Sequence, residues 1–410
     1  MSMPKLQKEK QRKICFIITS FIHYSRSLLI LEELRKRPDI ELHIVIGGTA
    51  LLPKYSSKYA FVKNILKDEG YKNLYEVYFN LEGDSPTVKA QTAGLGLIEF
   101  AHLFNNIKPD LIVVRGDRFE VLSAATAASY MNIPIAHIEG GDVTGTMDES
   151  VRHSITKLSH IHFVTNEAAR ERVLRMGEHK KYVFNYGSPE IEIAHKVAGG
   201  RTKIDLSTTG SGATVDPKKG YLMVMYHPVS TNIADLRDKT RVLLSTIHRL
   251  NLQTLWFWPN FDLGADDISH ELRKFNDETE NHRVRFLRYL PPQEFLLLLR
   301  SSKMLIGNSS AGIKECSYFG IPVVNVGTRQ AGRLRAGNVI DVLEEEKALE
   351  RAIKRQLTAK KYPSSKLYFA PNTSRNIAKT LATVNLYVQK RFHENRSFNL
   401  PAEFPDSLRG

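Results

Sequence analysis

The strongest constraint on the fold is an alternation of short, β-rich apolar runs with longer helical stretches along most of the chain. In the first half, the β-rich runs are residues 14–19, 42–46, 111–114, 133–138 and 161–165. Helical stretches lie between them, for example residues 121–130 and 151–159. This alternation is typical of βαβ units, which build parallel sheets. It predicts a doubly wound, Rossmann-like α/β domain over residues 14–197.

The alternation stops and then restarts, which indicates a second domain of the same type. Residues 198–220 are polar and rich in glycine, as expected of a linker. The later β-rich runs are residues 222–226, 254–258, 284–287, 304–306 and 323–326. We expect a second Rossmann-like domain over residues 221–372. Residues 373–410 are expected to form a C-terminal helix that packs back on the first domain, followed by a tail, and residues 1–13 a basic, flexible tail.

Composition narrows the class of protein without naming a function. The 410 residues carry a formal net charge of +14, which attracts anions. No basic stripe with interleaved aromatic residues indicates nucleic-acid binding, and no apolar run reaches the ~18 residues that a membrane span needs. The two cysteines, Cys15 and Cys316, belong to no paired-cysteine motif, and no secretion signal follows residues 1–13. We expect a cytoplasmic protein that binds neither nucleic acid nor membrane.

Motifs for common cofactors and metals are also missing from the sequence. No glycine fingerprint for dinucleotides follows the first predicted strand, and no P-loop occurs. The histidines His153, His160 and His162 do not have the spacing of a metal-ligand set. The sequence therefore predicts no metal and no cofactor.

Acidic side chains follow two consecutive strands of the first predicted sheet. Asp117 comes shortly after the strand at 111–114, and Glu139 comes directly after the strand at 133–138. In open parallel sheets, ligands bind beyond the carboxyl ends of the strands. If the two strands are neighbours, both carboxylates lie at the same functional edge. A solvated surface charge is the alternative for each.

More polar residues gather at the start of the next predicted helix. Asp148 and Glu149 begin this helix, and Arg152 lies one turn later. Crowded carboxylates raise one another's proton affinity, so one can hold a proton as general acid while another stays ionised as base. Asp148 taken alone could instead be an ordinary N-cap, the commoner role of an aspartate before a helix.

A small, hydroxyl-rich turn follows the strand at 304–306 in the second domain. Ser309 and Ser310 lie in this turn, and Glu315 lies about one helical turn further on. Such a turn presents backbone N–H groups to an anion, which suits a diphosphate. A carboxylate at the position of Glu315 could accept hydrogen bonds from both ribose hydroxyls.

Three further polar residues stand at predicted strand ends of the same domain. His227, Asn260 and Arg329 each follow a different strand and would lie on the same edge of the sheet. The alternatives are a hydrogen-bonded core histidine for His227 and a solvated basic loop for Arg329.

Together these segments resemble the hydrolysing UDP-N-acetylglucosamine 2-epimerases, which include the epimerase half of the bifunctional epimerase/N-acetylmannosamine kinase and bacterial enzymes of sialic and legionaminic acid synthesis. The resemblance runs from about residue 108 to residue 335. It rests on GDRFE at 116–120, HIEGGDVTGTMDESVRHSITKLSH at 137–160, HPV at 227–229, PN at 259–260, and GNSSAGIKE and GIPVVNVGTRQAGR within 307–333.

The resemblance implies a GT-B type fold, in which two Rossmann-like domains face each other across a cleft with the substrate between them. It implies hydrolysis of a UDP-linked 2-acetamido sugar, UDP-N-acetylglucosamine or a diacetamido-trideoxy analogue, to UDP and the free 2-epimer by way of a glucal. It also implies a homodimer or homotetramer. The expected catalytic carboxylates are Asp117, Glu139 and Asp148. The expected substrate-binding residues are Arg118, Glu149, Arg152, His227, Asn260, Ser309, Ser310, Glu315 and Arg329.

The loop after the first predicted strand departs from the family's pattern. It reads TSFIHYSRS at residues 19–27, without the usual arginine and the acidic residue that follows it. A positive group near the diphosphate would then have to come from His23 or Arg26. Arg115 also stands where the family often has histidine.

Three other functions share parts of this pattern. A GT-B glycosyltransferase has the turn and glutamate of the nucleotide half but needs no three carboxylates on the first domain. A non-hydrolysing 2-epimerase leaves its product attached to UDP. A catalytically impaired homologue would bind the nucleotide sugar without converting it.

Overall fold

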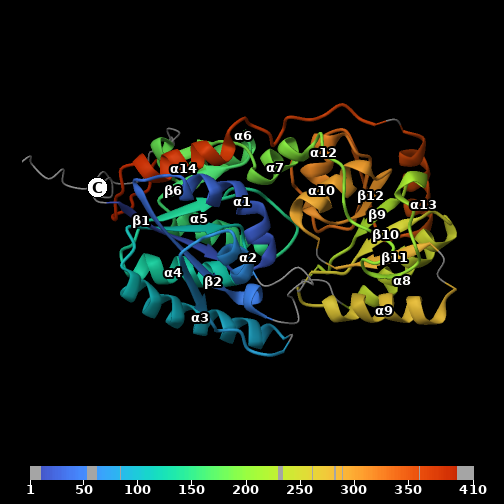
Figure 1. The fold of residues 1–410 in the computed structure, drawn as a ribbon, viewed down its shortest axis with the longest axis horizontal. Coiled ribbons are helices and arrows are strands. Elements are labelled where there is room, and N and C mark those ends of the chain that lie inside the picture. The colour runs from blue at the N-terminus through green and yellow to red at the C-terminus, as the bar shows by residue number, and fades with distance from the viewer. Residues whose placement is uncertain are drawn as a thin grey trace, which may run out of the picture.

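The chain forms two α/β domains side by side, each built around a central sheet covered by helices (Figure 1). The computed structural model describes residues 11–52, 62–83, 85–229, 234–260, 262–280, 283–288, 290–359 and 361–394. The expected α/β class with two doubly wound sheets is confirmed. The expected tails fall largely outside the described residues. The first, however, ends earlier than predicted, because strand β1 already begins at Arg12.

The first sheet has the strand order β3-β2-β1-β4-β5-β6-β7, and all its neighbouring strands are parallel. Its strands are β1 (Arg12–Ile18), β2 (Ile40–Gly47), β3 (Asn73–Val77), β4 (Leu111–Arg115), β5 (Ile135–Ile138), β6 (Ile161–Val164) and β7 (Val183–Asn185). The five predicted strands are present. The two that the sequence did not reveal are β3, which is only half-buried and mixes polar with apolar residues, and the three-residue edge strand β7.

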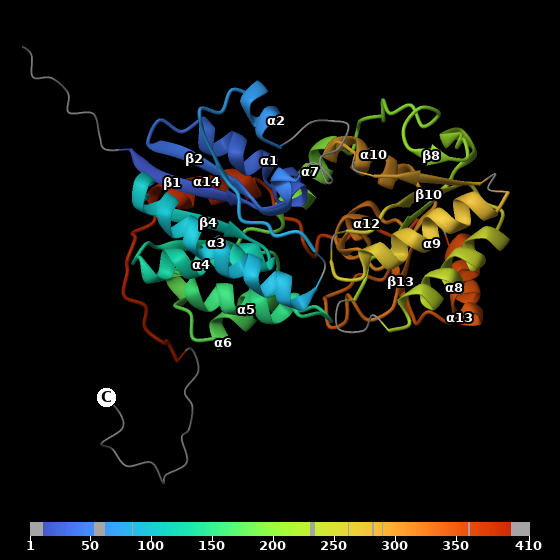
Figure 2. The same ribbon diagram turned by 90° about the horizontal axis from the view of Figure 1, so that it is seen from below.

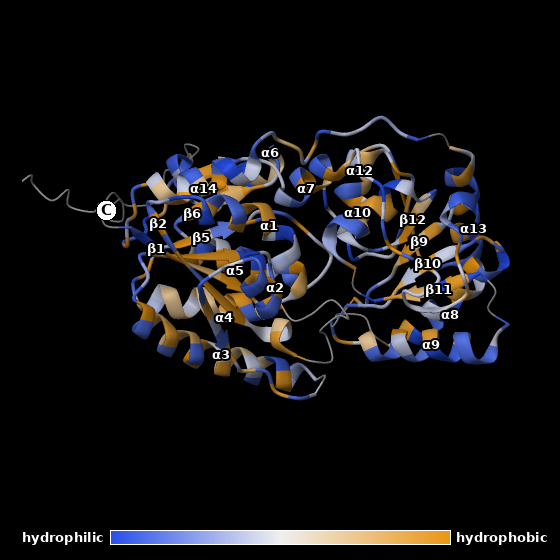
Figure 3. Ribbon diagram, viewed as in Figure 1, coloured by the Kyte–Doolittle hydropathy of each residue, from blue (hydrophilic) through white to orange (hydrophobic). Residues whose placement is uncertain are grey.

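Helices cover both faces of this sheet because successive side chains of a strand point to opposite sides. Ile14 and Phe16 belong to the core beneath α1 and α14, whereas Cys15 and Ile17 belong to the core beneath α3 and α4. The helices are α1 (Phe21–Arg35), α2 (Val62–Asp68), α3 (Pro86–Ile107), α4 (Phe119–Tyr130), α5 (Asp148–Leu158), α6 (Glu167–Arg175), α7 (Pro189–Val197) and α14 (Thr373–Thr383). Figure 3 shows apolar residues concentrated in the strands and polar residues on the outer helices.

The second sheet has the strand order β14-β13-β12-β9-β10-β11-β8, and only β8 is antiparallel to its neighbour. Its strands are β8 (Ser211–Gly212), β9 (Leu222–Met225), β10 (Thr254–Phe257), β11 (Val284–Leu287), β12 (Met304–Gly307), β13 (Val323–Val326) and β14 (Val339–Val342). Its helices are α8 (Leu236–Arg249), α9 (Ala265–Glu278), α10 (Pro292–Ser301), α11 (Ser310–Ile313), α12 (Glu315–Phe319) and α13 (Glu346–Thr358).

The segment predicted as a linker, residues 198–220, is partly built into the second domain. Its strand β8 pairs with β11, and Leu206 and Val215 are buried in the core of this domain. The buried guanidinium of Arg285 holds the segment, because it donates hydrogen bonds to the carbonyls of Thr209 and Ala213 at 2.6 and 3.0 Å. Backbone contacts of this kind do not show in composition, which is why the segment resembles a linker in the sequence.

Two segments connect the domains. Helix α7 lies between them, in contact with α10 and α12 (Figures 1 and 2). After α13 the chain returns to the first domain, where Ile377 and Leu381 of α14 join the core beneath α1. None of the described helices combines the length and the apolar character needed to cross a membrane.

The strand order indicates where a ligand-binding site is expected in each domain. In the first sheet it reverses between β1 and β4, and in the second between β9 and β12. A crevice forms at such a point, beyond the carboxyl ends of the strands. Loops that leave the two crevices touch each other: the Gly145 amide, beyond β5, donates a 3.2 Å hydrogen bond to the Arg329 carbonyl, beyond β13. The two crevices therefore face each other.

Candidate active site

Glu139 lies directly beyond β5 in a strained backbone conformation. Its φ is 70°, a left-handed value that a side chain other than glycine rarely adopts and that costs roughly 1–3 kcal/mol. The Glu139 amide is held by a 2.9 Å hydrogen bond to the carbonyl of Phe163 on the neighbouring strand β6. The sheet therefore turns the carboxylate away from the direction of the strand and toward the second domain.

The Glu139 carboxylate is buried between two cations. Arg115 Nε donates to its Oε2 atom at 2.9 Å, and Lys314 Nζ donates to its Oε1 atom at 2.5 Å. Burial acts to raise the pKa of Glu139, but the charges of Arg115, Lys314 and Arg26 outweigh it and hold this pKa well below its ordinary value. Glu139 is thus a carboxylate that stays ionised.

Asp117 is paired with a single buried arginine. Arg152 donates a hydrogen bond to Asp117 Oδ2 and another, 2.9 Å long, to the carbonyl of Asp142. Burial acts to raise the pKa of Asp117, but the charges of Arg152 and Arg333 outweigh it and lower this pKa. Because the side chain is 29% exposed, the second carboxylate oxygen remains within reach of a ligand.

Asp148 differs from both. Helix α5 begins at Asp148 after Met147, and no side chain caps it, so the N-cap alternative does not hold. Thr146 Oγ1 donates to Asp148 Oδ2 at 3.1 Å. Burial, together with the negative charges of Asp117 and Asp262, raises the pKa of Asp148 to about 6. This carboxyl group can therefore hold a proton near neutral pH.

The residues around Asp148 shape the mouth of the site. Glu149 accepts a 2.5 Å hydrogen bond from the Thr144 amide, which holds the loop before α5. This loop lines an open pocket of about 510 Å³. Arg118 is held by the buried Glu120, with its Nη2 atom 2.8 Å from the carboxylate.

In the second domain, Asn308 joins the ends of two strands. The Asn308 side chain accepts from the His227 amide and donates to the His227 carbonyl, both at 2.8 Å. His227 Nδ1 accepts a 3.1 Å hydrogen bond from the Asn260 amide. Burial and the neighbouring charge of Arg329 lower the pKa of His227 to about 3, so the ring is neutral, as an accepting Nδ1 requires.

The hydroxyl-rich turn receives a cation from the first domain. Ser309 is the N-cap of the short helix α11 and accepts from the Ala311 amide at 3.3 Å. Arg26 of α1 donates to Ser310 Oγ at 2.9 Å and lies 3.8 Å from Glu315 Oε1.

Of the two positive groups that the sequence offers for the diphosphate, only Arg26 reaches this turn. His23 is buried against Thr19, with its Nδ1 atom 3.1 Å from the Thr19 hydroxyl. Burial and the charges of Arg118 and Arg115 lower the pKa of His23 to about 3. The ring is therefore uncharged.

Several buried polar atoms of the second domain have no hydrogen-bond partner among the described residues, and three of them belong to predicted site residues. These three are Glu315 Oε2, Asn260 Oδ1 and Arg329 Nε. Buried polar atoms in proteins are almost always paired, so these atoms are available to a polar ligand. The Arg329 guanidinium lies 3.4 Å from both the Asn308 carbonyl and the Asp262 carboxylate, which places it on the same edge as His227.

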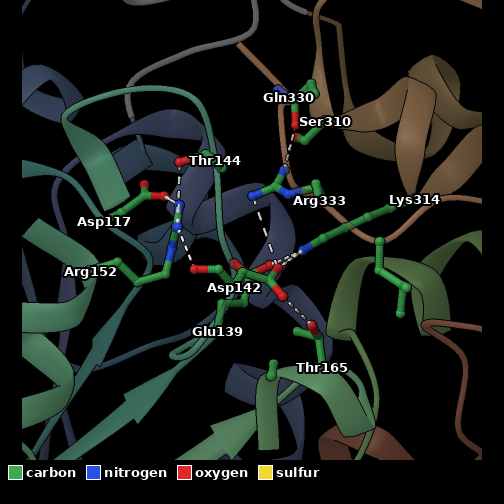
Figure 4. Close-up of polar contacts among 12 residues, drawn as sticks. Asp117, Glu139, Asp142, Thr144, Arg152, Thr165, Ser310, Lys314, Gln330 and Arg333 are labelled. Carbon is green, nitrogen blue, oxygen red and sulfur yellow. Dashed lines mark hydrogen bonds and ion pairs between the residues drawn. The ribbon is translucent and has the colours of Figure 1, made fainter. Parts of the chain in front are cut away.

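The structure also brings in residues that sequence reasoning missed. Lys314, Glu190 and Asp142 form a buried ion cluster with Glu139, and Arg333 lies 4.0 Å from Asp142. Figure 4 shows Lys314 and Arg333 pointing toward Asp142. The available signal was a lysine inside the turn GNSSAGIKE, among small and apolar residues where a solvated charge has no place.

All the predicted site residues therefore lie on two facing edges. The described residues contain no cluster of three or more metal-ligating side chains.

The chain is similar to known proteins over most of its length. The family profile of the UDP-N-acetylglucosamine 2-epimerases matches residues 32–382. A Legionella pneumophila protein named UDP-N,N'-diacetylbacillosamine 2-epimerase (hydrolyzing) is 32% identical over 92% of this chain and 97% of its own. A Campylobacter jejuni protein named GDP/UDP-N,N'-diacetylbacillosamine 2-epimerase (hydrolyzing) is 32% identical over 81% of this chain and 84% of its own.

Solved structures share the fold. The UDP-GlcNAc 2-epimerase of Methanocaldococcus jannaschii in complex with UDP-GlcNAc and UDP superposes with a TM-score of 0.72 at 18% identity, covering 90% of this chain and 99% of that one. This likeness confirms the expected GT-B type arrangement. Because the family profile spans most of the sequence, the chain belongs to the UDP-N-acetylglucosamine 2-epimerase family.

Proposed function

We propose that the protein is a hydrolysing 2-epimerase, which converts a UDP-linked 2-acetamido sugar and water to UDP and the free 2-epimeric sugar. The observation that carries this proposal is the contrast among the three carboxylates. Asp148 has its pKa raised to about 6, whereas the pKa values of Asp117 and Glu139 are lowered. Carboxyl groups with pKa values pushed apart are the acid and the base of a proton-transfer mechanism.

The first half of the reaction is elimination. The C1–O bond breaks, its electron pair leaves with UDP, and positive charge develops at C1. This charge makes the C2 hydrogen acidic, so a weak base is sufficient. Asp117, which keeps one oxygen accessible, takes the C2 proton while the C–H electron pair forms the C1=C2 double bond of the glucal.

The second half is hydration with the opposite configuration at C2. Asp148 donates its proton to the other face of C2, water adds to C1, and the water loses a proton. Two protons are then available, this one and the one on Asp117. One of them restores Asp148, and the other leaves with UDP. Glu139 cannot serve as the acid, because Arg115 and Lys314 keep it ionised. Its fixed negative charge stabilises the cationic C1 in both halves.

The second domain would hold the nucleotide. Glu315 Oε2 and Asn260 Oδ1 are acceptors without hydrogen-bond partners among the residues that the structure describes, and they are suited to ribose hydroxyl or base N–H groups. Arg329 and Arg26 supply positive charge toward the diphosphate, and the Ser309–Ser310 turn adds backbone N–H groups. These donors would stabilise the departing UDP.

For the sugar, we propose a 2,4-diacetamido-trideoxy donor first and UDP-N-acetylglucosamine second. The relatives that are 32% identical are named for diacetylbacillosamine. A Neisseria meningitidis relative named UDP-N-acetylglucosamine 2-epimerase is 29% identical over 88% of this chain. We further propose a homodimer or homotetramer, which sedimentation of the purified protein would test.

The decisive experiment is incubation with each donor in deuterium oxide, followed by NMR. We expect free UDP and a 2-epimeric sugar that carries deuterium at C2. Product that stays attached to UDP would identify a non-hydrolysing epimerase. Transfer to an acceptor with C2 hydrogen retained would identify a glycosyltransferase, and binding of UDP without any product would identify an inactive homologue.

A further inference from the structure

Glu139 and three other buried side chains form a closed ring of alternating charge. Arg115 binds Glu139 Oε2 through Nε at 2.9 Å and Glu190 Oε2 through Nη2 at 2.5 Å. Lys314 Nζ binds the other oxygens, Glu139 Oε1 at 2.5 Å and Glu190 Oε1 at 3.0 Å. Each carboxylate thus binds one cation with each of its two oxygens, and all four residues are buried.

The ring closes across the boundary between the domains. Arg115 ends β4, Glu139 follows β5, and Glu190 lies in the first turn of α7, so these three residues belong to the first domain. Lys314 belongs to the second domain and separates α11 from α12. Figure 4 shows its side chain extending from that domain toward Glu139 and Asp142. Its neighbour in the chain, Glu315, is one of the proposed nucleotide ligands.

Two further side chains lie close to the Lys314 ammonium group. This group lies within 3.7 Å of a third carboxylate, that of Asp142, and 5.5 Å from the centre of the Tyr368 ring. Burial acts to lower the pKa of Lys314, but Glu139 and Glu190 outweigh it and raise this pKa. Removing one partner of a buried ion pair leaves an uncompensated buried charge and is strongly destabilising, so the cations and carboxylates of the ring depend on one another.

We propose that Lys314 is a positioning residue for Glu139: it completes the ring from the second domain and so ties the orientation and charge of the Glu139 carboxylate to contact between the domains. The inference rests on the proposed function, because it gives Glu139 a place beside the sugar. Without Lys314, Glu139 Oε1 is free to take up a proton. With it, both oxygens are bound, and Glu139 acts only as a fixed negative charge. Assembly of the nucleotide site and fixing of this charge are then a single event.

Other titratable or charged groups also face the ring. They are His23 and Arg26 on α1, Asp117 after β4, Asp142 after β5, Arg333 and Tyr368 from the second domain's side, and Glu315 on α12. None of them bonds Glu139 Oε1, which is the atom that Lys314 occupies.

Two substitutions should move the ionisation of Glu139 in opposite directions. Lys314→Met removes a cation and leaves Glu190 beside Glu139, so the proton affinity of Glu139 rises. Glu190→Gln removes the like charge and leaves both cations, so this affinity falls. If Lys314 only held the domains together, these two substitutions would not be expected to shift the proton affinity of Glu139 in opposite directions.

The kinetic test is the pH dependence of kcat for the full-length variants. We expect Lys314→Met to lower kcat and to move the acid limb of the profile upward by about one pH unit or more. We expect Lys314→Arg to restore the limb, and Glu190→Gln not to raise it. The control Lys347→Met, an exposed lysine on α13, should match the wild type. A higher KM with an unmoved acid limb in Lys314→Met would overturn the proposal.

A second readout needs no turnover. The protein is labelled with ¹³C at its glutamate carboxyl groups and observed by NMR. The signal that is present in the wild type and absent in Glu139→Gln is assigned to Glu139. We expect this signal to stay at its ionised position in the wild type and to titrate in Lys314→Met, or in Lys314→Gln if the methionine variant does not fold. An unchanged signal in the lysine variants refutes the role of Lys314. If the wild type converts no donor, the proposed function fails, while this titration still decides the positioning claim.

Discussion

Arg26 of helix α1 donates a 2.9 Å hydrogen bond to Ser310 Oγ, in the turn that begins α11 of the other domain. The cation that the first domain contributes to the nucleotide half thus comes from a helix, not from the loop after the first strand. Arg26 is also 3.8 Å from Glu315. One side chain therefore contacts both the turn and the carboxylate proposed to bind the ribose.

We expect Arg26→Met to raise the Kd for UDP by about tenfold or more, because a hydrogen bond to a charged group contributes about 1.5–3 kcal/mol. Isothermal titration calorimetry measures this. Arg26→Lys should recover part of the affinity, and Lys36→Met, at the exposed end of the same helix, should leave it unchanged. Wild-type affinity in Arg26→Met would show that Arg26 has no part in binding UDP.

Asp148→Asn should remove activity and raise stability. Loss of a general acid lowers kcat by about 100-fold or more. The pKa of Asp148 is raised from 3.8 to about 6 on folding, so its contribution to stability is present at acid pH and is lost as the pH rises through about 6. The variant should therefore have a higher Tm than the wild type above this pH and an equal Tm at pH values below the unfolded pKa. Calorimetry at two pH values checks this, and a lower Tm at neutral pH would contradict it.

The activity of the wild type should also decrease as the pH rises, because the proposed acid must carry a proton. The basic limb of kcat/KM in the free enzyme is expected near pH 6, the pKa of Asp148. A profile that is flat from pH 5 to 8 would assign the acid to another group.

Gly145→Ala tests the contact between the loops of the two domains. A Cβ atom at Gly145 would lie 2.0 Å from the Thr328 carbonyl oxygen, so the loops must move apart. We expect kcat/KM to fall by about 100-fold, because misplacing groups by an ångström costs that much. Gly94→Ala on α3, where a Cβ meets no atom within 4 Å, is the matched control and should keep full activity.

Lys390→Met should lower stability and leave catalysis intact. Lys390 Nζ lies 2.7 Å from the carboxylate of the buried Glu178. Burial acts to raise the pKa of Glu178, but His162 and Lys390 outweigh it and lower this pKa to about 2. We expect a loss of about 1–3 kcal/mol in the free energy of unfolding, measured in urea. The variant Glu178→Gln should reduce this loss, because the methionine then no longer removes a charge partner from a buried carboxylate. Equal losses in both backgrounds would show that the two residues are not coupled.

The sequence predicted the residues whose position follows from a strand. Asp117, Glu139 and His227 each come after a β-rich run, and parallel topology brings such residues to one edge. Lys314 could not be found this way, because its side chain reaches a carboxylate 175 positions earlier in the chain and in the other domain. The charge state of a group also lies beyond sequence pattern. His23 and Arg26 were equal candidates until burial made the histidine neutral.

Asp148 illustrates a different limit. Its role depended on whether α5 begins at this residue or one residue later, and the start of a helix is the part of a pattern that sequence defines least well. In the structure Met147 is the N-cap, so the carboxylate is left to face Asp117 and Asp262. Strand β8 is a further feature that the sequence pattern could not reveal, because its segment is held by hydrogen bonds from a residue distant in sequence, Arg285.

The return of the chain to α14 has a mechanical consequence. The polypeptide passes between the lobes twice, once after α7 and once before α14, and Leu381 anchors the second passage in the first core. Two tethers permit bending about the line that joins them and resist twisting. A protease that cuts one tether leaves the halves attached by the other, so nicked protein should remain a single particle.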